Sequence, residues 1–535
     1  MKFLMIYPNV TGNTKVPLGI IYLLTLLKNA GHEVRLFDMT FYGIELEKHD
    51  IFIRGRFLNF KPVDLAPYGV TYQHSTMADV EKDLSNEIKS FKPDLIGVSI
   101  TEDTSMTGIR LAEAAKRAAP GTPVIFGGVF CMSSPEWVFE HKCVDMMCTG
   151  EGEELILKLA ESFDNKKSCD DIPGLWIKKK NGRAVKNALA YPISMDSLPF
   201  MDLSLVDERH FYNPMAGHVY KMTFVQSQRG CPRRCTYCCN QLFLNIYKKT
   251  HGGGYLRKQS IPRFVDEMAD IKQKYGMNFF QIVDDDFTLR PLAELKEFAR
   301  LYKQKVNLPW WIQAEANHIT DEKIAILVDC GLMCGSVGIE TGSDYVRENV
   351  YKRNTTKAKT REAFEIMHRH GMRTSGNIII GVPHEGRKEI FETIELVREC
   401  KPKSLNVNIF APYRGTELRD YCVKMGYLKE DFIRNSAESW KPVIEMPQIS
   451  HKEIEGFIRT FVLYCFLPKK YWPQIKKCEE YSLESDEIMQ ELEEIFWEIA
   501  EKRGINYDVP GYDYDGFLAA RQKEMAARAK QQRKK

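Results

Sequence analysis

The sequence predicts an α/β protein in which an N-terminal Rossmann-like doubly wound parallel sheet precedes a partial TIM-type (β/α)6 barrel and a helical C-terminal region. Two observations lead to this prediction. Short β-type apolar runs alternate with amphipathic helical stretches over the first 160 residues, and the same rhythm resumes after residue 220. From about residue 436 onward only helical patterns are found.

The first predicted domain, residues 1–160, has five strand candidates, at 2–7, 33–37, 94–100, 124–126 and 144–148. Helices are expected between them, at 20–30 before Gly31 and at 108–118 before Pro120-Gly121. Residues 161–220 carry turn signals at Pro173-Gly174 and Asn181-Gly182, which predict a hairpin and a linker.

The second predicted domain, residues 221–435, repeats strand and helix six times. Its strand candidates are 223–227, 279–283, 311–314, 336–339, 374–380 and 404–410. A parallel barrel of this kind carries its chemistry at the carboxyl ends of the strands. The third region, residues 436–535, is expected to be helical, with helices at 451–467 and 483–502.

Composition excludes several classes of protein. Across 535 residues, 75 basic side chains nearly balance 72 acidic ones, so no nucleic-acid partner is expected. The longest apolar run, residues 16–27, is too short to cross a bilayer, and the first residues lack a secretory signal. A cytoplasmic location is therefore expected, in which most of the 14 cysteines are reduced and serve as small buried side chains.

Three cysteines after the first barrel strand are spaced C-x3-C-x2-C, namely Cys231, Cys235 and Cys238. Three thiolates on one short loop can ligate three irons of a [4Fe–4S] cluster and leave the fourth iron open, whereas electron-carrying ferredoxins use a fourth cysteine. Cys239 follows directly, and we expect its side chain to point away from the cluster, in a structural or neighbouring role. Zinc is the alternative metal, but no second CxxC pair occurs in the chain.

This segment resembles the radical S-adenosylmethionine (SAM) superfamily, in which the aromatic residue before the third cysteine, here Tyr237, contacts the adenine. Further matches follow later barrel strands in the family's order. They are Asp284-Asp285-Asp286-Phe287, Gly338-Ile339-Glu340-Thr341-Gly342, Gly381-Val382-Pro383 and Ala411-Pro412-Tyr413-Arg414-Gly415-Thr416, where Arg414 replaces the usual proline. Taken singly, such turns are expected at any strand end.

The resemblance implies SAM-binding residues. Glu340 is expected to contact the ribose or the amino acid part of SAM, and Asp284 or Asp285 to line the active site. Gln313 and Asn377 are polar residues in apolar strands, so we expect them to face the barrel interior, either as SAM contacts or as hydrogen-bonded core groups.

The N-terminal domain lacks the GxGxxG fingerprint of a nicotinamide site after its first strand. Its opening segment, Val16-Pro17-Leu18-Gly19, resembles that of the cobalamin-binding radical SAM enzymes. Small residues at the carboxyl edge of a parallel sheet let a flat macrocycle approach the backbone. The cobalamin contacts that the resemblance implies are Pro17, Gly19, Ser99, Thr101, Gly127, Gly128, Glu151 and Gly152.

Two departures bear on the cobalamin prediction. The family's Gly-Gly-x-His motif reads Gly127-Gly-Val-Phe130 here, and no Asp-x-His-x-x-G sequence occurs, so no histidine ligand to cobalt is expected. A degenerate domain that has lost cobalamin is the alternative.

The function implied by the resemblance is cobalamin-dependent methylation of an unactivated carbon, with a radical from reductively cleaved SAM abstracting hydrogen from the substrate. A non-methylating relative that performs cyclisation, oxidation or carbon–carbon bond formation is the main alternative, and an iron–sulfur or corrinoid carrier is another. A reductant such as flavodoxin or ferredoxin is an expected partner. The substrate class stays open among small molecules, lipids and peptides; an apolar stripe in the helix at 451–467 is either a lipid-like surface or a buried face.

Overall fold

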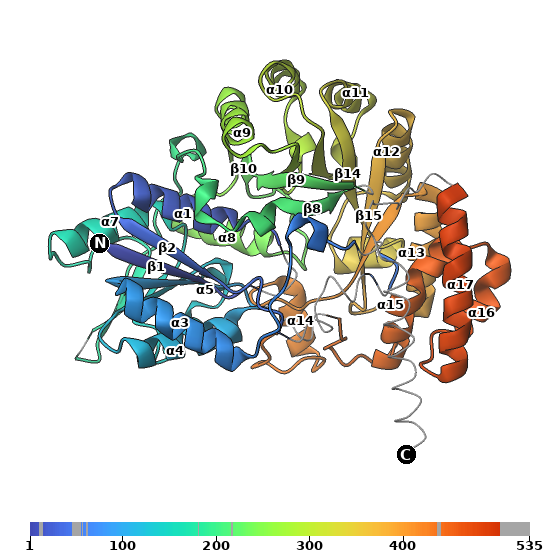
Figure 1. Ribbon diagram of the computed structural model, residues 1–535. Helices are drawn as coiled ribbons and strands as arrows, with labels where there is room; N and C mark the ends of the chain where they lie inside the picture. The colour runs from blue at the N-terminus through green and yellow to red at the C-terminus, as the bar shows by residue number, and fades with distance from the viewer. Residues whose placement is uncertain are drawn as a thin grey trace.

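The computed structural model describes residues 1–9, 14–44, 55, 57–59, 63–179, 181–215, 218–435 and 440–502. Two seven-stranded sheets dominate the molecule and lie side by side, with a group of helices at the far end of the second sheet (Figure 1). None of the helices in these ranges is long and apolar enough to span a membrane.

The first sheet has the strand order β2-β1-β3-β4-β5-β6-β7, and its first five strands are parallel. These strands are β1 (Lys2–Tyr7), β2 (Glu33–Asp38), β3 (Leu95–Ser99), β4 (Val124–Gly127) and β5 (Met146–Cys148). Both faces of the sheet are buried, because Leu4 and Ile6 of β1 enter one hydrophobic core and Phe3 and Met5 enter another. This two-sided burial is typical of a doubly wound fold.

Helices cover the two faces of this sheet. On one face lie α3 (Met77–Phe91) and α4 (Ser105–Ala118), and on the other α1 (Leu18–Asn29) and α7 (Glu153–Asp164). The short helices α5 (Val129–Ser133) and α6 (Pro135–Glu140) follow β4. The predicted hairpin is present as β6 (Leu175–Lys178) and β7 (Ala184–Lys186), and it pairs with β5, so it extends the first sheet.

The second sheet has the order β16-β15-β14-β13-β12-β9-β8, and its six strands from β9 to β16 are parallel. They are β9 (His218–Val225), β12 (Phe279–Ile282), β13 (Trp310–Ala314), β14 (Leu332–Glu340), β15 (Arg373–Ile380) and β16 (Ser404–Ile409). The additional strand β8 (Tyr212–Met215) is antiparallel to β9. Because β16 and β8 are the ends of the sheet in the described part of the chain, the barrel is partial.

The convex side of the second sheet is covered by helices, as Figure 1 shows for α9 to α12. These are α9 (Ile261–Tyr275), α10 (Leu292–Lys305), α11 (Asp321–Asp329), α12 (Lys357–Arg369) and α13 (Arg387–Cys400). A segment of the N-terminal domain reaches the free edge of the sheet: the Asn59 side-chain oxygen accepts a hydrogen bond of 3.2 Å from the Val407 backbone N–H of β16. Leu58 beside it is buried in the core of the barrel.

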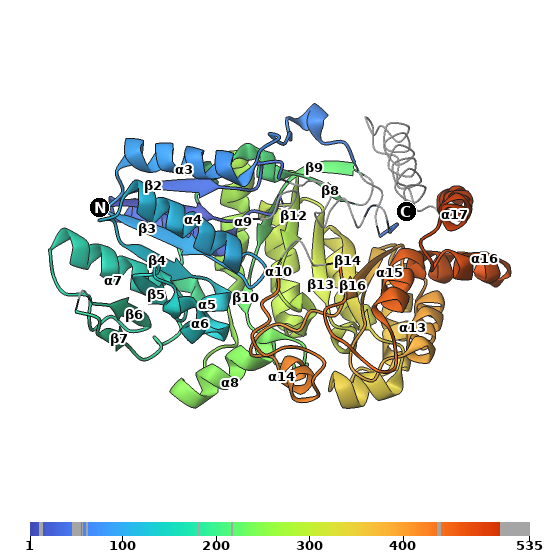
Figure 2. The same ribbon diagram turned by 90° about the horizontal axis from the view of Figure 1, so that it is seen from below.

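The C-terminal region is helical in its described part, with α14 (Glu417–Lys424), α15 (His451–Phe466), α16 (Trp472–Lys477) and α17 (Leu483–Lys502). Figure 2 shows α15 beside α13 at the end of the barrel. The apolar stripe of α15 is buried, with Phe457 and Phe461 fully enclosed. Its role is therefore packing, and the alternative of a lipid-like surface on these residues is wrong.

Candidate active site at the facing ends of the two sheets

The three-cysteine loop lies at the carboxyl end of β9, between the short strand β10 (Gln228–Arg229) and helix α8 (Cys239–His251). Cys231, Cys235 and Cys238 are free thiols without a disulfide. Burial raises the pKa of Cys231 to about 12, with smaller contributions from Asp285 and the other two thiols. Three neighbouring thiols on a half-buried loop fit a metal cluster that lowers their proton affinity when it binds.

Cys239 is half-buried and is the first residue of α8, directly after the third cysteine. The interaction between the two thiols raises the pKa of Cys238 and lowers that of Cys239. That its side chain points away from the cluster stays a prediction.

Arg353 is the cation that organises the cysteine loop. Its Nη1 donates a 3.1 Å hydrogen bond to the Tyr237 hydroxyl and lies 4.0 Å from the Cys235 sulfur. Its Nη2 donates to the Gly338 carbonyl at 3.2 Å, and its Nη1 lies 3.8 Å from Glu340 Oε1. One guanidinium therefore links the cluster loop to the end of β14.

Glu340 ends β14 in a left-handed backbone conformation, with φ of +63°. A Cβ at position 338 would lie 2.5 Å from the Glu340 carboxylate, so a larger residue there would displace this side chain. Burial raises the pKa of Glu340, and Arg353 is its only ion-pair partner among the described residues. Such backbone strain clusters at functional sites, and a carboxylate with spare acceptor capacity fits the hydroxyl or ammonium groups of SAM.

Two residues of the acidic turn after β12, Asp284 and Asp285, have different environments. Asp284 is fully buried, and its oxygens accept hydrogen bonds from Ser227 N, Ser227 Oγ and Gln228 N. It braces the start of the cysteine loop, and this geometry does not favour direct contact with SAM. Asp285 is exposed beside the loop and accepts a 3.0 Å hydrogen bond from Asn240. The SAM contacts proposed for both residues stay predictions.

Gln313 and Asn377 lie on the face of the second sheet that points away from the helices. Gln313 is exposed within a central strand. The Asn377 side-chain oxygen accepts hydrogen bonds from Ser336 Oγ at 3.0 Å and Asn406 Nδ2 at 3.3 Å. Whether either residue touches SAM is likewise still a prediction.

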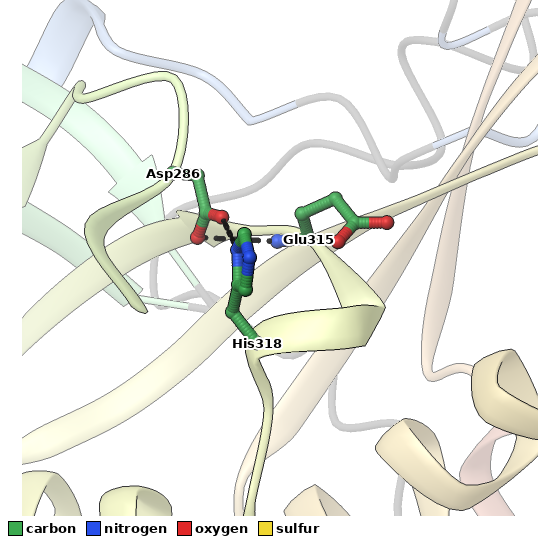
Figure 3. Close-up of side chains that lie close together, drawn as sticks. All are labelled: Asp286, Glu315 and His318. Atoms are coloured by element: carbon green, nitrogen blue, oxygen red, sulfur yellow. Dashed lines mark hydrogen bonds and ion pairs between the residues drawn. The ribbon is translucent and has the colours of Figure 1, made fainter. Parts of the chain in front are cut away.

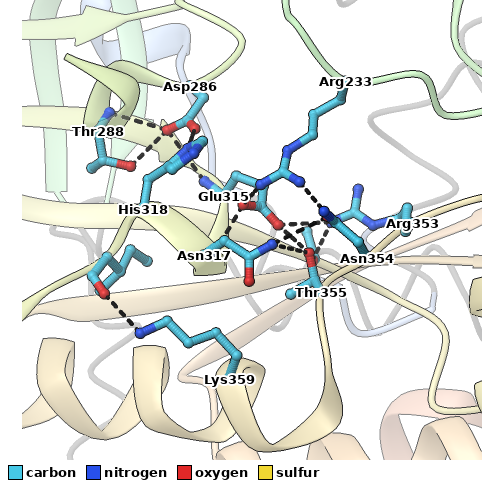
Figure 4. A network of polar contacts seen from close by, with 12 residues as sticks. Arg233, Asp286, Thr288, Glu315, Asn317, His318, Arg353, Asn354, Thr355 and Lys359 are labelled. Atoms are coloured by element: carbon cyan, nitrogen blue, oxygen red, sulfur yellow. Dashed lines mark hydrogen bonds and ion pairs between the residues drawn. The ribbon is translucent and has the colours of Figure 1, made fainter.

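Glu315, which follows β13, holds the cysteine loop from a second side. Its Oε2 accepts a 2.5 Å hydrogen bond from Arg233, which lies between the first two cysteines, and its Oε1 accepts one from Thr355 (Figure 4). Arg353 is 3.8 Å from the same carboxylate. Glu315 is thus shared by two arginines that both reach the cluster loop.

Asp286, Glu315 and His318 form a compact acidic and histidine group (Figure 3). The Asp286 carboxylate accepts hydrogen bonds from the Glu315 backbone at 3.3 Å, from His318 Nδ1 at 2.5 Å and from Thr288. The oxygens of Asp286 and Glu315 accept hydrogen bonds within the chain, so this group braces Glu315 beside the cysteine loop.

The predicted cobalamin residues lie at the carboxyl edge of the first sheet, after β1, β3, β4 and β5. Gly128 has φ of +99°, and a Cβ there would lie 2.4 Å from the Ile100 carbonyl oxygen. Among the remaining predicted residues, all are half-exposed or exposed: Pro17, Gly19, Ser99, Thr101, Gly127, Glu151 and Gly152. A glycine-lined edge of this kind fits a large flat ligand, although the individual contacts stay predictions.

Two polar clamps join this edge to the barrel. Arg229, just before the cysteine loop, forms ion pairs with Glu153 at 2.5 Å and Glu151 at 3.2 Å, and Arg257 also binds Glu151. The Glu102 carboxylate, after β3, accepts hydrogen bonds from the backbone N–H groups of Arg414 at 2.8 Å and Arg434 at 3.2 Å. The carboxyl ends of the two sheets therefore face each other, and the Glu151 side chain serves this clamp.

Sequence reasoning did not identify Arg353, Glu315, Arg233 or Arg229 as site residues. Arg229 and Arg233 lie within or beside the cysteine motif, which was a usable signal. Arg353 is 116 residues from Tyr237, and no local pattern links the two.

Comparison with known proteins agrees with this geometry. The sequence model described as the Radical SAM superfamily matches residues 225–397, which include the cysteine loop and β12 to β15. The chain belongs to the radical SAM superfamily. The B12 binding domain matches residues 65–160, so this radical SAM enzyme also carries a cobalamin-binding domain.

Similar proteins span most of this radical SAM chain. An uncharacterized methyltransferase of Pyrococcus horikoshii is 23% identical over 88% of this chain and 93% of its own. An anaerobic magnesium-protoporphyrin IX monomethyl ester cyclase of Rubrivivax gelatinosus is 24% identical over 63% and 60%. Among solved structures, TsrM from Kitasatospora setae, a radical SAM methyltransferase with cobalamin and a [4Fe–4S] cluster bound, covers 92% of this chain and 99% of its own at 15% identity, with a TM-score of 0.61.

Proposed function

We propose that this radical SAM enzyme transfers a methyl group to an unactivated carbon of its substrate with the help of cobalamin. The observation that carries the proposal is the facing arrangement of the two sheet ends, held by the pairing of Arg229 with Glu151 and Glu153. This arrangement supports the proposal, because the predicted cobalamin residues and the cysteine loop lie at the two facing sheet ends. When bound, the cluster with SAM supplies a hydrogen-abstracting radical, and cobalamin supplies the methyl group.

The chain's own part is to position these groups. Cys231, Cys235 and Cys238 hold the cluster and leave one iron for SAM. Tyr237, fixed by Arg353, contacts the adenine, and Glu340 binds the ribose or amino acid part. Gly127 and Gly128 leave room for the corrin, and substrate occupies the barrel lumen.

Reduction of the cluster requires an electron donor such as flavodoxin or ferredoxin. We also propose a cytoplasmic location, where such donors and reduced thiols are found. The proposal includes no transmembrane segment.

A non-methylating reaction is the second candidate, favoured by the similarity to the magnesium-protoporphyrin ester cyclase. Product analysis separates the two. Methylation predicts a product heavier by one methylene together with S-adenosylhomocysteine and 5′-deoxyadenosine. A product without the added methylene, formed while 5′-deoxyadenosine accumulates, would favour cyclisation or oxidation.

A further inference from the structure

The barrel lumen has a polar wall. Along β15 and β16 every second side chain is half-exposed, while those between are buried. The buried set, which includes Ile378 and Val407, belongs to the core shared with the outer helices. The half-exposed set therefore faces the lumen. Gln313 on the same face is exposed although β13 is a central strand, so this face is open to solvent at Gln313.

Arg373 is a cation of this lumen face. It is the first residue of β15, it pairs in register with Cys334 of β14, and it precedes Ser375 and Asn377 on the same side of the strand. At a rise of about 3.3 Å per residue, its Cα lies about 13 Å below that of Asn377, away from the cysteine loop. Arg373 is also near enough to Tyr220 and Cys334 to lower the pKa of both groups against the effect of burial.

The Arg373 side chain has neither a hydrogen bond nor an ion pair within the described ranges of the chain, although its backbone belongs to the sheet. Other arginines of the barrel are paired: Arg290 with Glu294 and Arg353 with Glu340. A guanidinium has five N–H donors, and partial burial without acceptors is costly. A half-buried guanidinium without a partner on this partly exposed face is suited to an oxyanion that comes from outside the chain.

A small cluster of apolar side chains lies next to Arg373. Met222, Phe279 and Cys334 form a small buried cluster against which Tyr220 and Trp311 pack. Trp311 pairs in register with Cys334, which in turn pairs with Arg373, so the indole and the guanidinium occupy one row of the lumen. This row therefore offers a positive charge beside aromatic surface.

We propose that Arg373 binds the anionic group of the substrate, and that the substrate is a small organic acid with a carboxylate or a phosphate-type group. Its carbon skeleton lies over Trp311 and Tyr220, and Gln313 and Asn377 donate hydrogen bonds higher in the lumen. A neutral lipid would bury these polar groups without partners, so the lumen disfavours it. This inference rests on the proposed function, because it assumes that the lumen is the substrate site.

The test uses the full chain reconstituted with cluster and hydroxocobalamin, and isothermal titration with three probes. These are phenylacetate, phenylphosphonate and the neutral phenylacetamide. We expect both anions to bind the wild type, Arg373→Gln to weaken them at least about tenfold, and Arg373→Lys to weaken them less. Arg361→Gln is the matched control, because Arg361 pairs with Glu399 on the outer surface.

The two anions distinguish the sources of the negative charge, since the tighter one identifies the preferred group. Unchanged affinity of both anions for Arg373→Gln would overturn the inference. So would the absence of anion binding to the wild type, or amide binding as tight as that of the anions. An unchanged melting temperature shows that the variant is folded.

The same samples are assayed for 5′-deoxyadenosine. Suppose that both the wild type and Arg373→Gln cleave SAM, and that the two proteins bind the anions with the same affinity. Then only the inference about the substrate fails. If anions bind through Arg373 but no 5′-deoxyadenosine forms, the proposed function fails and the binding site remains.

Discussion

Arg353 donates a 3.1 Å hydrogen bond to the hydroxyl of Tyr237, the aromatic residue that precedes the third cysteine of the cluster loop. The Tyr237 ring is also held edge-on against Tyr351, with ring centroids 4.8 Å apart. The predicted adenine contact is thus fixed from two sides before SAM arrives, which lowers the entropy cost of binding.

Replacing Arg353 tests this arrangement. Arg353→Ala removes the donor to Tyr237 and the partner of Glu340, so SAM binding should weaken by about tenfold or more, with iron content retained. The measurement is the SAM dependence of 5′-deoxyadenosine formation, with iron and sulfide analysis on the same samples. Arg369→Ala, which removes an exposed ion pair with Asp321, is the control. An unchanged SAM dependence would show that Arg353 does not position the site.

The clamp between the domains makes a stability prediction. Arg229→Met leaves the buried Glu153 carboxylate without its partner, so the free energy of unfolding should fall by about 3 kcal/mol. Lys258→Ala breaks an exposed pair with Glu294 and should cost under about 1 kcal/mol. Denaturant unfolding of both variants checks this, and equal effects would argue against a clamp at Arg229.

Gly128 makes a prediction about the cobalamin edge. Gly128→Ala adds a Cβ 2.4 Å from the Ile100 carbonyl in a left-handed backbone, so the loop after β4 must shift. We expect reduced cobalamin content, read from the visible absorbance after reconstitution, at unchanged iron content. Gly121→Ala is matched, because its Cβ meets open space. Equal corrin content in both variants would contradict the assigned edge.

The burial of Glu385 leads us to predict that the stability of the protein depends on pH. Burial raises the pKa of its carboxyl to about 8 from an ordinary value of 4.5, despite a hydrogen bond from the Gly381 backbone N–H. The folded state therefore favours the protonated form. Its contribution to stability is complete below the ordinary value and is lost as the pH rises through about 8.

Glu385→Gln keeps the group neutral at every pH. The melting temperature of this variant relative to the wild type should therefore rise between about pH 5 and pH 8 and level off above that. A difference that stays constant over this range would mean that the Glu385 carboxyl is not protonated in the folded protein.

Much of the fold could be predicted from the sequence, because apolar runs mark buried parallel strands. The run at 404–410 corresponds to β16 (Ser404–Ile409) within one residue. The prediction of 336–339 was too short for β14 (Leu332–Glu340), since Cys334-Gly335 interrupts the apolar pattern. Strand β9 begins at His218, earlier than predicted, because its polar first half pairs with β8.

The site was predictable only where its chemistry is local. The spacing of Cys231, Cys235 and Cys238 points to an open cluster, and Tyr237 lies within the same motif. Glu315 and Arg353 come from other loops, 82 residues from Arg233 and 116 from Tyr237. Their partners depend on how the strands of the second sheet are arranged in space, and no local sequence pattern shows which loops meet.

The most direct test of the account is anaerobic reconstitution with iron, sulfide and hydroxocobalamin, followed by reduction in the presence of SAM. We predict a corrin absorbance band in the purified protein and formation of 5′-deoxyadenosine, which Cys235→Ala abolishes while the corrin band remains. A protein that binds a cluster but no corrin, or that leaves SAM intact when reduced, would contradict it.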